Sequence, residues 1–154
     1  MEQYQLRGNR VEPMRLAEIA SRASHIGNYF GFTRRKKKQL DIAFEKLSEF
    51  GITLNVVPDE EWLNLTKGHF DPSTLTISIP QNIYLNACMG EQEALGVMLH
   101  ELGHLFLGHR ALLHHTSVLP TIEEDAEWQA DSFADVILKR MGYQTAQLSF
   151  DFYM

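Results

Sequence analysis

Five consecutive residues carry the strongest chemical signal in this sequence. They form the HExxH motif His100-Glu101-Leu102-Gly103-His104. Because residues four apart lie one turn above each other on one face of a helix, both histidines can reach a single zinc ion. Glu101 would lie beside the water molecule that such an ion activates. The motif therefore predicts two zinc ligands and the general base of a zinc-dependent peptidase.

The residues around the motif predict a helix that packs on one side and presents its histidines on the other. At 100° per residue, His100 and His104 fall opposite a narrow apolar arc. That arc contains Leu95, Leu99, Leu102 and Phe106, with Met98 and Leu105 at its side. A catalytic zinc ion has a third protein ligand and one open position. The sequence should therefore supply another His, Glu or Asp on a second element.

A second helix is expected after residue 120, because Thr121 and Glu124 have the spacing of a capping box. On this helix Glu127 and Asp131 lie four residues apart, at the border of an apolar arc. Two like charges at this spacing destabilise a helix unless a cation or a donor lies against them. We therefore expect Glu127 to complete the metal coordination. Asp131 would accept the free ring N–H of a ligand histidine, with His100 as the expected partner, and fix its tautomer.

Together the two segments resemble the ImmA/IrrE family of metallopeptidases. That family has a gluzincin-like site similar to that of thermolysin, in which HExxH is followed by Glu-x-x-x-Asp or Glu-x-x-x-Asn. Here His100-Glu-Leu-Gly-His104 is followed by Glu127-Trp-Gln-Ala-Asp131. Residues 68–77 are also similar to the strand pair that precedes the motif helix in the family. The resemblance extends over roughly the middle and C-terminal part of the chain, about residues 52 to 138.

The resemblance implies an activity and a role. His100, His104 and Glu127 would be the zinc ligands, and Glu101 would be the catalytic base. The typical role in the family implies that this protein cleaves a transcriptional repressor of a phage, a mobile element or a stress regulon. The metzincin pattern fits poorly, because its third histidine follows the first by ten residues, whereas His109 follows His100 by nine.

Two further hypotheses use the same residues differently. In the first, the protein is a non-catalytic binding module, for example a repressor antagonist, whose zinc is structural. Structural zinc is usually closed by four protein ligands, and the fourth would be His109, His114 or Cys88. In the second, the protein binds no metal and interacts with partners through a basic run and its C-terminal tail.

Length and composition agree with a small soluble enzyme. The 154 residues are expected to form one domain that buries about two thirds of its unfolded surface. The net charge of −6 argues against a chain that coats nucleic acid, so no direct nucleic-acid contact is expected. The single Cys88 excludes an internal disulfide and suits a reducing compartment. Since neither an apolar leader nor a membrane-spanning stretch is evident, we expect a cytoplasmic protein.

The remaining patterns predict an α+β fold that is mainly helical, with a small three-stranded antiparallel or mixed sheet packed on the motif helix. Two scaffold helices are expected, one from Pro13 to a stop at Gly31 and one from Thr33 to Phe50, with Gly51 as its stop. We expect three strands, the last two joined by a hairpin turn: residues 52–57, 65–70 and 74–79.

The last of these strands alternates in polarity. Its apolar residues Leu75, Ile77 and Ile79 should therefore cover the motif helix. An exposed strand edge could pair antiparallel with an extended substrate peptide, because backbone hydrogen bonds hold a segment without demanding a particular sequence. Which strand forms that edge does not follow from the sequence.

Three segments are expected to lie outside regular elements. Residues 1–11 should form a loose N-terminal arm, residues 80–90 a connection over or beside the cleft, and residues 144–154 a tail. Within the tail, Gln147-Leu-Ser-Phe-Asp-Phe152 is similar to the short peptide by which bacterial proteins bind the sliding clamp of the replisome. The tail either docks on a partner in this way or packs as a terminal strand or arm.

Two assignments remain open. The residue that donates a hydrogen bond to the oxyanion during peptide hydrolysis would be His109, His114, His115 or Tyr84. The resemblance favours His109, because the family often carries a histidine there. The basic run Arg34–Lys38 would lie in the first turn of a helix, where the helix dipole disfavours cations. It is either a solvated face or a docking surface for an acidic or DNA-bound partner.

Overall fold

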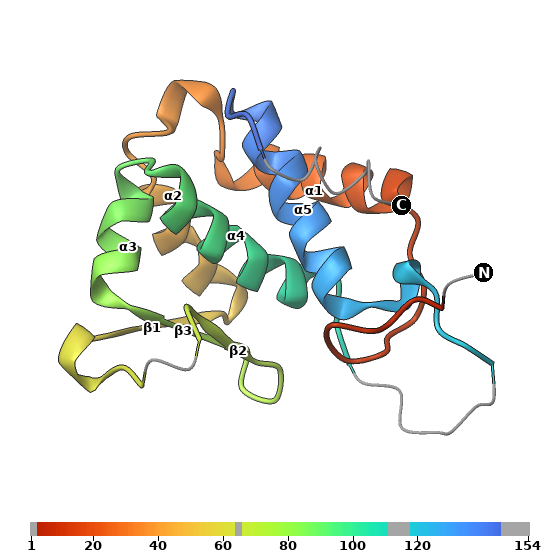
Figure 1. The fold of residues 1–154 in the computed structure, drawn as a ribbon. Coiled ribbons are helices and arrows are strands. Elements are labelled where there is room, and N and C mark those ends of the chain that lie inside the picture. Colours follow the sequence, from red (N-terminus) through yellow and green to blue (C-terminus); the bar gives the residue numbers. More distant parts are fainter. Residues whose placement is uncertain (1–2, 64–65, 111–117, 146–154) are drawn as a thin grey trace.

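Two helices of fifteen residues each form the centre of the fold and lie against each other: α4 (Gln92–Phe106) and α5 (Ala126–Arg140) (Figure 1). α4 carries the HExxH motif, whereas α5 carries the two predicted carboxylates. The computed structural model describes the chain from residue 3 to residue 145, without residues 64–65 and 111–117. Around these helices the described residues form a small α+β domain, as predicted.

α4 begins and ends where its capping residues require. The Glu91 carboxylate accepts hydrogen bonds from the backbone N–H groups of Glu93 and Ala94, which have no partner within the first turn. After Phe106 the chain turns back at Gly108, whose φ of 67° is readily adopted only by glycine. The predicted apolar side is confirmed by four fully buried residues: Leu95, Met98, Leu99 and Leu102.

α5 begins later than its capping box suggests. Thr121 and Glu124 do form the box, but it opens a single 3₁₀ turn rather than the helix itself. Asp125 then caps α5, because its buried carboxylate accepts the backbone N–H of Glu127. The expected start of the helix is therefore wrong by about one turn. Glu127 therefore lies in the first turn of α5, and its backbone N–H donates to the capping residue Asp125.

α4 and α5 approach each other closely at the motif. Gly103 faces Ala130, and a Cβ atom at Gly103 would come 3.1 Å from the Cα atom of Ala130. Because both residues are small, the two backbones can meet here. This close approach brings the motif histidines within reach of the first turn of α5.

The sheet lies against α4 and is mixed. β3 (Thr76–Pro80) is the central strand, with β1 (Thr53–Val57) parallel and β2 (His69–Asp71) antiparallel to it. The three predicted strands and the hairpin are therefore confirmed, although the last two strands begin later than predicted, at His69 rather than residue 65 and at Thr76 rather than residue 74. β1 and β2 are the two edge strands of this sheet.

The apolar face of β3 is confirmed at Ile77 and Ile79, which are fully buried. Leu75 is a correction. It lies in the turn before β3 with a φ of 52°, and 42% of it is exposed. The two-residue alternation that places Ile77 and Ile79 on one face does not extend into a turn, where the backbone is no longer extended.

The first predicted helix is confirmed as α1 (Leu16–Phe30), which packs on α5 and ends at Gly31 in the left-handed conformation. The single helix predicted for residues 33–50 is wrong. That stretch is divided into three short pieces: a 3₁₀ turn at Arg34–Lys36, α2 (Asp41–Glu45) and a 3₁₀ helix at Lys46–Phe50.

The interruption has physical reasons. Five consecutive cations at Arg34–Lys38 would repel one another at helical spacing. In addition, the backbone N–H of Leu40 donates to the carbonyl of Cys88 instead of to a carbonyl one turn earlier. Because the basic run does not lie at the start of a long helix, the unfavourable dipole interaction expected from the sequence does not arise.

The expected connection at residues 80–90 is also corrected, because it contains α3 (Gln81–Cys88). This helix packs on α4 and on the sheet. Its inner face consists of residues at helical spacing: Ile83, Tyr84, Ala87 and Cys88. The spacing was present in the sequence, but eight residues give only two turns of periodic signal.

The N-terminal segment is not a loose arm from residue 3 onward. It runs beside the start of α5 (Figure 1), where Asp125 is fully buried. The Asp125 carboxylate accepts hydrogen bonds from the Tyr4 hydroxyl and from the backbone N–H groups of Arg7 and Gly8. A buried carboxylate needs such donors, so the segment and the helix start stabilise each other.

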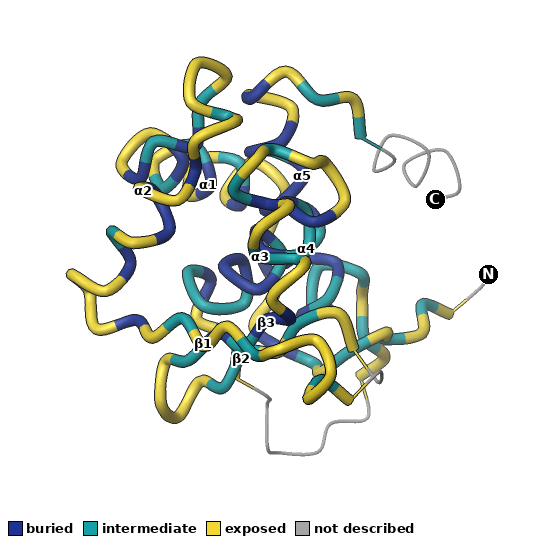
Figure 2. Tube along the Cα trace, turned by 90° about the vertical axis from the view of Figure 1, so that its left-hand side faces the viewer, coloured by how far each residue is buried: buried dark blue, intermediate teal, exposed yellow. Residues whose placement is uncertain are grey.

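The buried residues gather where the helices and the sheet meet, and exposed residues cover the outer turns (Figure 2). Within the described part of the chain, every helix is too short or too polar to span a lipid bilayer.

Candidate metal centre

Three of the predicted side chains converge on one point between α4 and α5. The Nε2 atoms of His100 and His104 are 3.1 Å apart. The two carboxylate oxygens of Glu127 lie 3.2 Å from the Nε2 atom of His100 and 2.9 Å from that of His104. Their potential ligand atoms all lie within 4.8 Å of one another, so these residues form a group that could hold a metal ion.

The spacing of these atoms suits a small divalent cation. Nitrogen and oxygen ligands at about 2.0 to 2.2 Å from a tetrahedral zinc ion lie about 3.3 Å from one another. The three observed separations, 2.9 to 3.2 Å, are close to that value. Two imidazoles and one carboxylate also match the donor set of catalytic rather than structural zinc sites.

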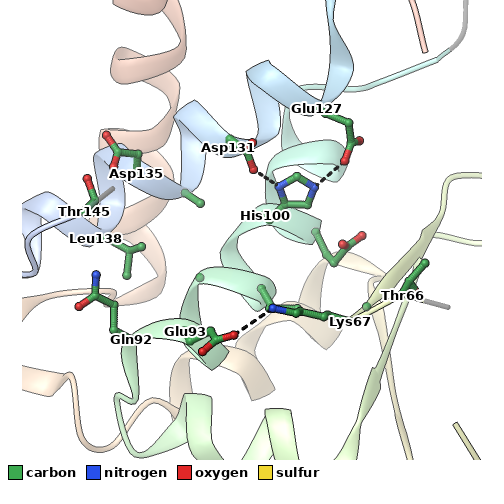
Figure 3. Close-up of a pocket in the computed structure, with 15 residues that line it drawn as sticks. Thr66, Lys67, Gln92, Glu93, His100, Glu127, Asp131, Asp135, Leu138 and Thr145 are labelled. Carbon is green, nitrogen blue, oxygen red and sulfur yellow. Dashed lines mark hydrogen bonds and ion pairs between the residues drawn. The ribbon is translucent and has the colours of Figure 1, made fainter. Parts of the chain in front are cut away.

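Asp131 holds His100 from the side opposite the group. Its Oδ1 atom lies 2.7 Å from the Nδ1 atom of His100, and its Oδ2 atom accepts a hydrogen bond of 2.9 Å from the Arg7 guanidinium. Figure 3 shows His100 between Asp131 and Glu127. With the Nδ1 proton donated to Asp131, the Nε2 lone pair of His100 is available to a cation.

The carboxylates around His100 change its protonation. Burial disfavours the charged ring, but the hydrogen bonds to Asp131 and Glu127 outweigh burial and raise the pKa of His100 to about 10. Hydrogen bonds from His100 and His104 hold the pKa of Glu127 far below its usual range. Without a metal, the charged ring of His100 therefore forms ion pairs with the carboxylates of Asp131 and Glu127. A proton on His100 then lies near the position that a cation would occupy.

Glu101 lies beside the group but is not one of its members. It is buried on α4, and Gly68 packs against its side chain so closely that a Cβ atom there would come 3.2 Å from its Cγ atom. Burial raises the pKa of the Glu101 carboxyl. A carboxylate with a raised pKa next to a metal position is suited to accept and return a proton near neutral pH.

The group opens onto two cavities. One, of about 550 Å³, extends along α4 and α5 past Asp131, as Figure 3 shows. The other, of about 270 Å³, lies between β2 and the N-terminal segment and is lined by Gly68, His69 and Asn9. His100, Glu101 and Glu127 line both cavities. The centre can therefore be reached from a cleft that continues on either side of it.

The sequence matches a family model over residues 37–143, which is more than half of the chain. That model describes the IrrE N-terminal-like domain of the M78 peptidases. The chain belongs to this family. The IrrE-like assignment agrees with the resemblance seen in the HExxH and Glu-x-x-x-Asp segments, both of which lie inside the matched range. Neither the curated proteins nor the solved structures that were compared contain a match.

Membership of this family supports a metallopeptidase type of function. The residues predicted from the sequence to stabilise the oxyanion differ in their positions relative to the metal group. Both ring nitrogens of His109 are already engaged, although the residue lines the smaller cavity: its Nδ1 atom lies 2.8 Å from Nδ1 of His104 and its Nε2 atom 2.7 Å from Oε1 of Gln129. Burial lowers the pKa of His109 to about 4, so this ring is neutral. His114 and His115 lie outside the described residues.

The remaining oxyanion candidate, Tyr84, and one of the possible fourth zinc ligands, Cys88, both lie on α3. Tyr84 packs against Phe44 and lines a third cavity, away from the metal group. Cys88, which was a possible fourth zinc ligand, interacts with Tyr84 and is not a member of the metal-binding group found among the described residues. Neither side chain lines the two cavities at the centre.

Four residues at the centre of the IrrE-like domain were not predicted from the sequence. Arg7 and Gly8 reach it from the N-terminal segment, His69 from β2 and Gln129 from the inner face of α5. Arg7 and Gly8 are more than one hundred residues from their partners in sequence, so no local pattern indicates them. Gln129 gives a weak signal, because it is a polar residue among the buried positions of a helix.

Proposed function

We propose that this protein is a zinc-dependent metallo-endopeptidase. The observation that carries the proposal is the convergence of His100, His104 and Glu127 on one point, with buried Glu101 beside it and a cleft on both sides. Membership of the M78 peptidase family supports the same activity. Three protein ligands leave one position of a tetrahedral zinc ion for water or substrate.

Zinc held by these side chains would polarise the scissile carbonyl and make water a nucleophile near neutral pH. Glu101 accepts the proton of the attacking water and then returns it to the leaving amine. Its raised pKa favours the return of the proton, and its burial keeps the carboxylate close to the reacting atoms. Asp131 and the ring of His100 keep the Nε2 atom directed to the centre.

His69 is our candidate for stabilising the oxyanion. It lines the smaller cavity together with Glu101 and His104. The two ring nitrogens of His109 are already engaged, whereas the ring of His69, whose backbone pairs with β3, has no hydrogen-bond partner among the described residues. A ring N–H of His69 is therefore free to be donated to a substrate oxygen in the cleft.

β2 is our candidate for binding the substrate backbone. It is an edge strand of the sheet, and the residues at its start, Gly68, His69 and Phe70, line the cavity at the centre. An extended peptide could add to this edge as a further strand, which places its carbonyls beside the metal group. Such binding reads the backbone, so it would select an exposed, extended segment of a protein.

The biological substrate we propose is a transcriptional repressor of a phage, a mobile element or a stress regulon, cleaved in the cytoplasm. This part of the proposal is supported by the resemblance of the motif segments to the ImmA/IrrE family. A repressor antagonist that binds without cutting would need the same cleft but not Glu101. The role of Glu101 therefore separates the two functions.

The test compares the wild-type protein with Glu101→Gln, each incubated with zinc and the repressors encoded near its gene. The wild type should produce defined fragments. Glu101→Gln should bind one zinc ion per chain, measured by atomic absorption, and lose cleavage by at least about a hundredfold. Equal cleavage by the variant would contradict the mechanism, and a wild-type protein that binds a repressor but leaves it intact would favour the antagonist.

A further inference from the structure

Gln129 is a buried amide whose orientation is settled by its neighbours. Its Nε2 group donates to two backbone carbonyls, those of Glu12 at 2.8 Å and Glu123 at 2.7 Å. An amide nitrogen has two hydrogens, and both are used by these carbonyls. The Oε1 atom must therefore be the end that faces His109, where it can only accept a hydrogen bond.

This orientation determines where His109 carries its hydrogen. The Nε2 atom of His109 lies 2.7 Å from Oε1 of Gln129, so Nε2–H must be the donor. In a neutral imidazole the other nitrogen then has a lone pair. The Nδ1 atom of His109 is thus an acceptor, and it lies 2.8 Å from Nδ1 of His104.

The next ring in the chain of hydrogen bonds is His104. Because His109 presents a lone pair, the Nδ1 atom of His104 must donate a hydrogen to it. With a metal bound, the Nε2 atom of His104 then presents its lone pair to the ion, and this atom lies 2.9 Å from a carboxylate oxygen of Glu127. At this distance a hydrogen or a cation must lie between the two atoms, because a lone pair that faces a carboxylate oxygen directly is unfavourable.

From these contacts we infer that Gln129 and His109 are positioning residues for the metal centre. They hold His104 in the single tautomer whose Nε2 lone pair is directed to the ion, as Asp131 does for His100. The inference deepens the proposed function and rests on it, since it assumes that His104 is a ligand. It also explains why His109 follows the motif after Gly108, because the turn there directs the ring back under His104.

The chain of hydrogen bonds reaches the N-terminal segment as well. One of the two carbonyls that orient Gln129 belongs to Glu12, and the other to Glu123 just before α5. Asp125, two residues after Glu123, accepts hydrogen bonds from the Tyr4 hydroxyl and from the backbone N–H of Gly8. The tautomer of a ligand on α4 is therefore determined by backbone groups from two other parts of the chain.

The test uses two variants of similar size. His109→Asn keeps an acceptor oxygen at the place of the Nδ1 atom, whereas His109→Leu offers none. The zinc dissociation constant, measured by competition with a chelator, should rise about 10- to 100-fold in His109→Leu. It should stay within about threefold of the wild-type value in His109→Asn. Equal zinc affinity of the two variants would overturn the inference.

A second measurement needs no variant. Long-range ¹⁵N–¹H correlation spectra of the zinc-loaded wild type should show His104 with its proton on Nδ1 and His109 with its proton on Nε2. A zinc-loaded His104 that carries its proton on Nε2 would also overturn the inference. Both measurements follow zinc binding and not cleavage, so a protein that binds zinc without cutting peptides would disprove the proposed function and leave this result standing.

Discussion

At the level of single residues, each nitrogen that faces the metal position has a partner behind its ring. Asp131 accepts from His100, and His109 accepts from His104. Asp131 and His109 are both partly buried, so each of them needs hydrogen-bond partners in any case. Among the described residues Glu101 has no such partner, which suits a side chain that must exchange protons.

A histidine on β2 provides the first prediction. His69→Ala should lower kcat for a peptide substrate by about 10²-fold, because one donor to the oxyanion is removed. KM should change little and zinc affinity should not change, since His69 is not a member of the metal-binding group. Steady-state kinetics with a fluorogenic peptide, together with the zinc dissociation constant, measure these effects.

His25→Ala is the matched control for this prediction. His25 is an exposed histidine on α1 that lines neither cavity at the centre. It should keep the wild-type kcat. If His69→Ala keeps the wild-type kcat as well, another group stabilises the oxyanion.

At the level of elements, the two helices that carry the centre follow directly from the sequence. Leu95, Leu99, Leu102 and Phe106 repeat with a period of 3.6 residues over about three turns, and the histidines lie on the opposite face. A pattern of that length predicts both the helix and its orientation. The pairing of Glu127 with the motif follows because a catalytic zinc ion needs a third ligand.

Other elements depend on contacts that no local pattern contains. The stretch before α2 resembles a helix until the backbone of Leu40 is bound by Cys88 from α3. The direction of His109 depends on the left-handed turn at Gly108, and the sequence alone does not show that its two ring nitrogens are directed to His104 and Gln129. The N-terminal segment looks polar and loose, yet its backbone donors satisfy the buried Asp125.

The contact between the N-terminal segment and α5 provides the second prediction. A Cβ atom at Gly8 would come 2.6 Å from the Cγ atom of Glu127. Gly8→Ala should therefore displace the Glu127 carboxylate and raise the zinc dissociation constant about tenfold. Chelator competition measures the affinity, and circular dichroism of the zinc-free variant verifies the fold.

Gly27→Ala is the control for this substitution. Gly27 is a buried glycine of α1, and an added Cβ atom would meet Ile137 at an ordinary 3.7 Å. Zinc affinity should be that of the wild type. Wild-type zinc affinity in Gly8→Ala would show that the N-terminal segment does not position Glu127.

At the level of the whole molecule, the metal centre depends on more of the chain than the family model covers. The match begins at residue 37, whereas Arg7, Gly8 and Glu12 contact residues of the centre or of its support. The centre is thus built from α4, α5 and an N-terminal segment that the family description does not include. The protonation of the side chains at the centre therefore depends on α4, α5 and the N-terminal segment together.

The third prediction concerns pH. Hydrogen bonds to Asp131 and Glu127, acting against burial, raise the pKa of His100 to about 10, so the ring is charged at pH 7 in the metal-free protein. This charge stabilises the metal-free fold fully below about pH 6.5, and the contribution is lost as the pH rises through about 10. A metal needs the lone pair that this proton occupies.

Zinc binding near pH 7 should therefore release about one proton from His100, and the apparent affinity should fall about tenfold per unit as the pH is lowered. Calorimetric titrations in two buffers with different ionisation enthalpies measure the number of protons released. Release of no proton at pH 7 would mean that His100 is not a ligand or is already neutral.

The most direct test of the whole account is the diffraction of a zinc-soaked crystal at the zinc absorption edge. The account predicts one strong anomalous peak between α4 and α5, about 2.0 to 2.2 Å from the Nε2 atoms of His100 and His104 and from a carboxylate oxygen of Glu127. The fourth direction should open to the cleft beside Glu101. A peak closed by four protein ligands, or one located away from these three side chains, would contradict it.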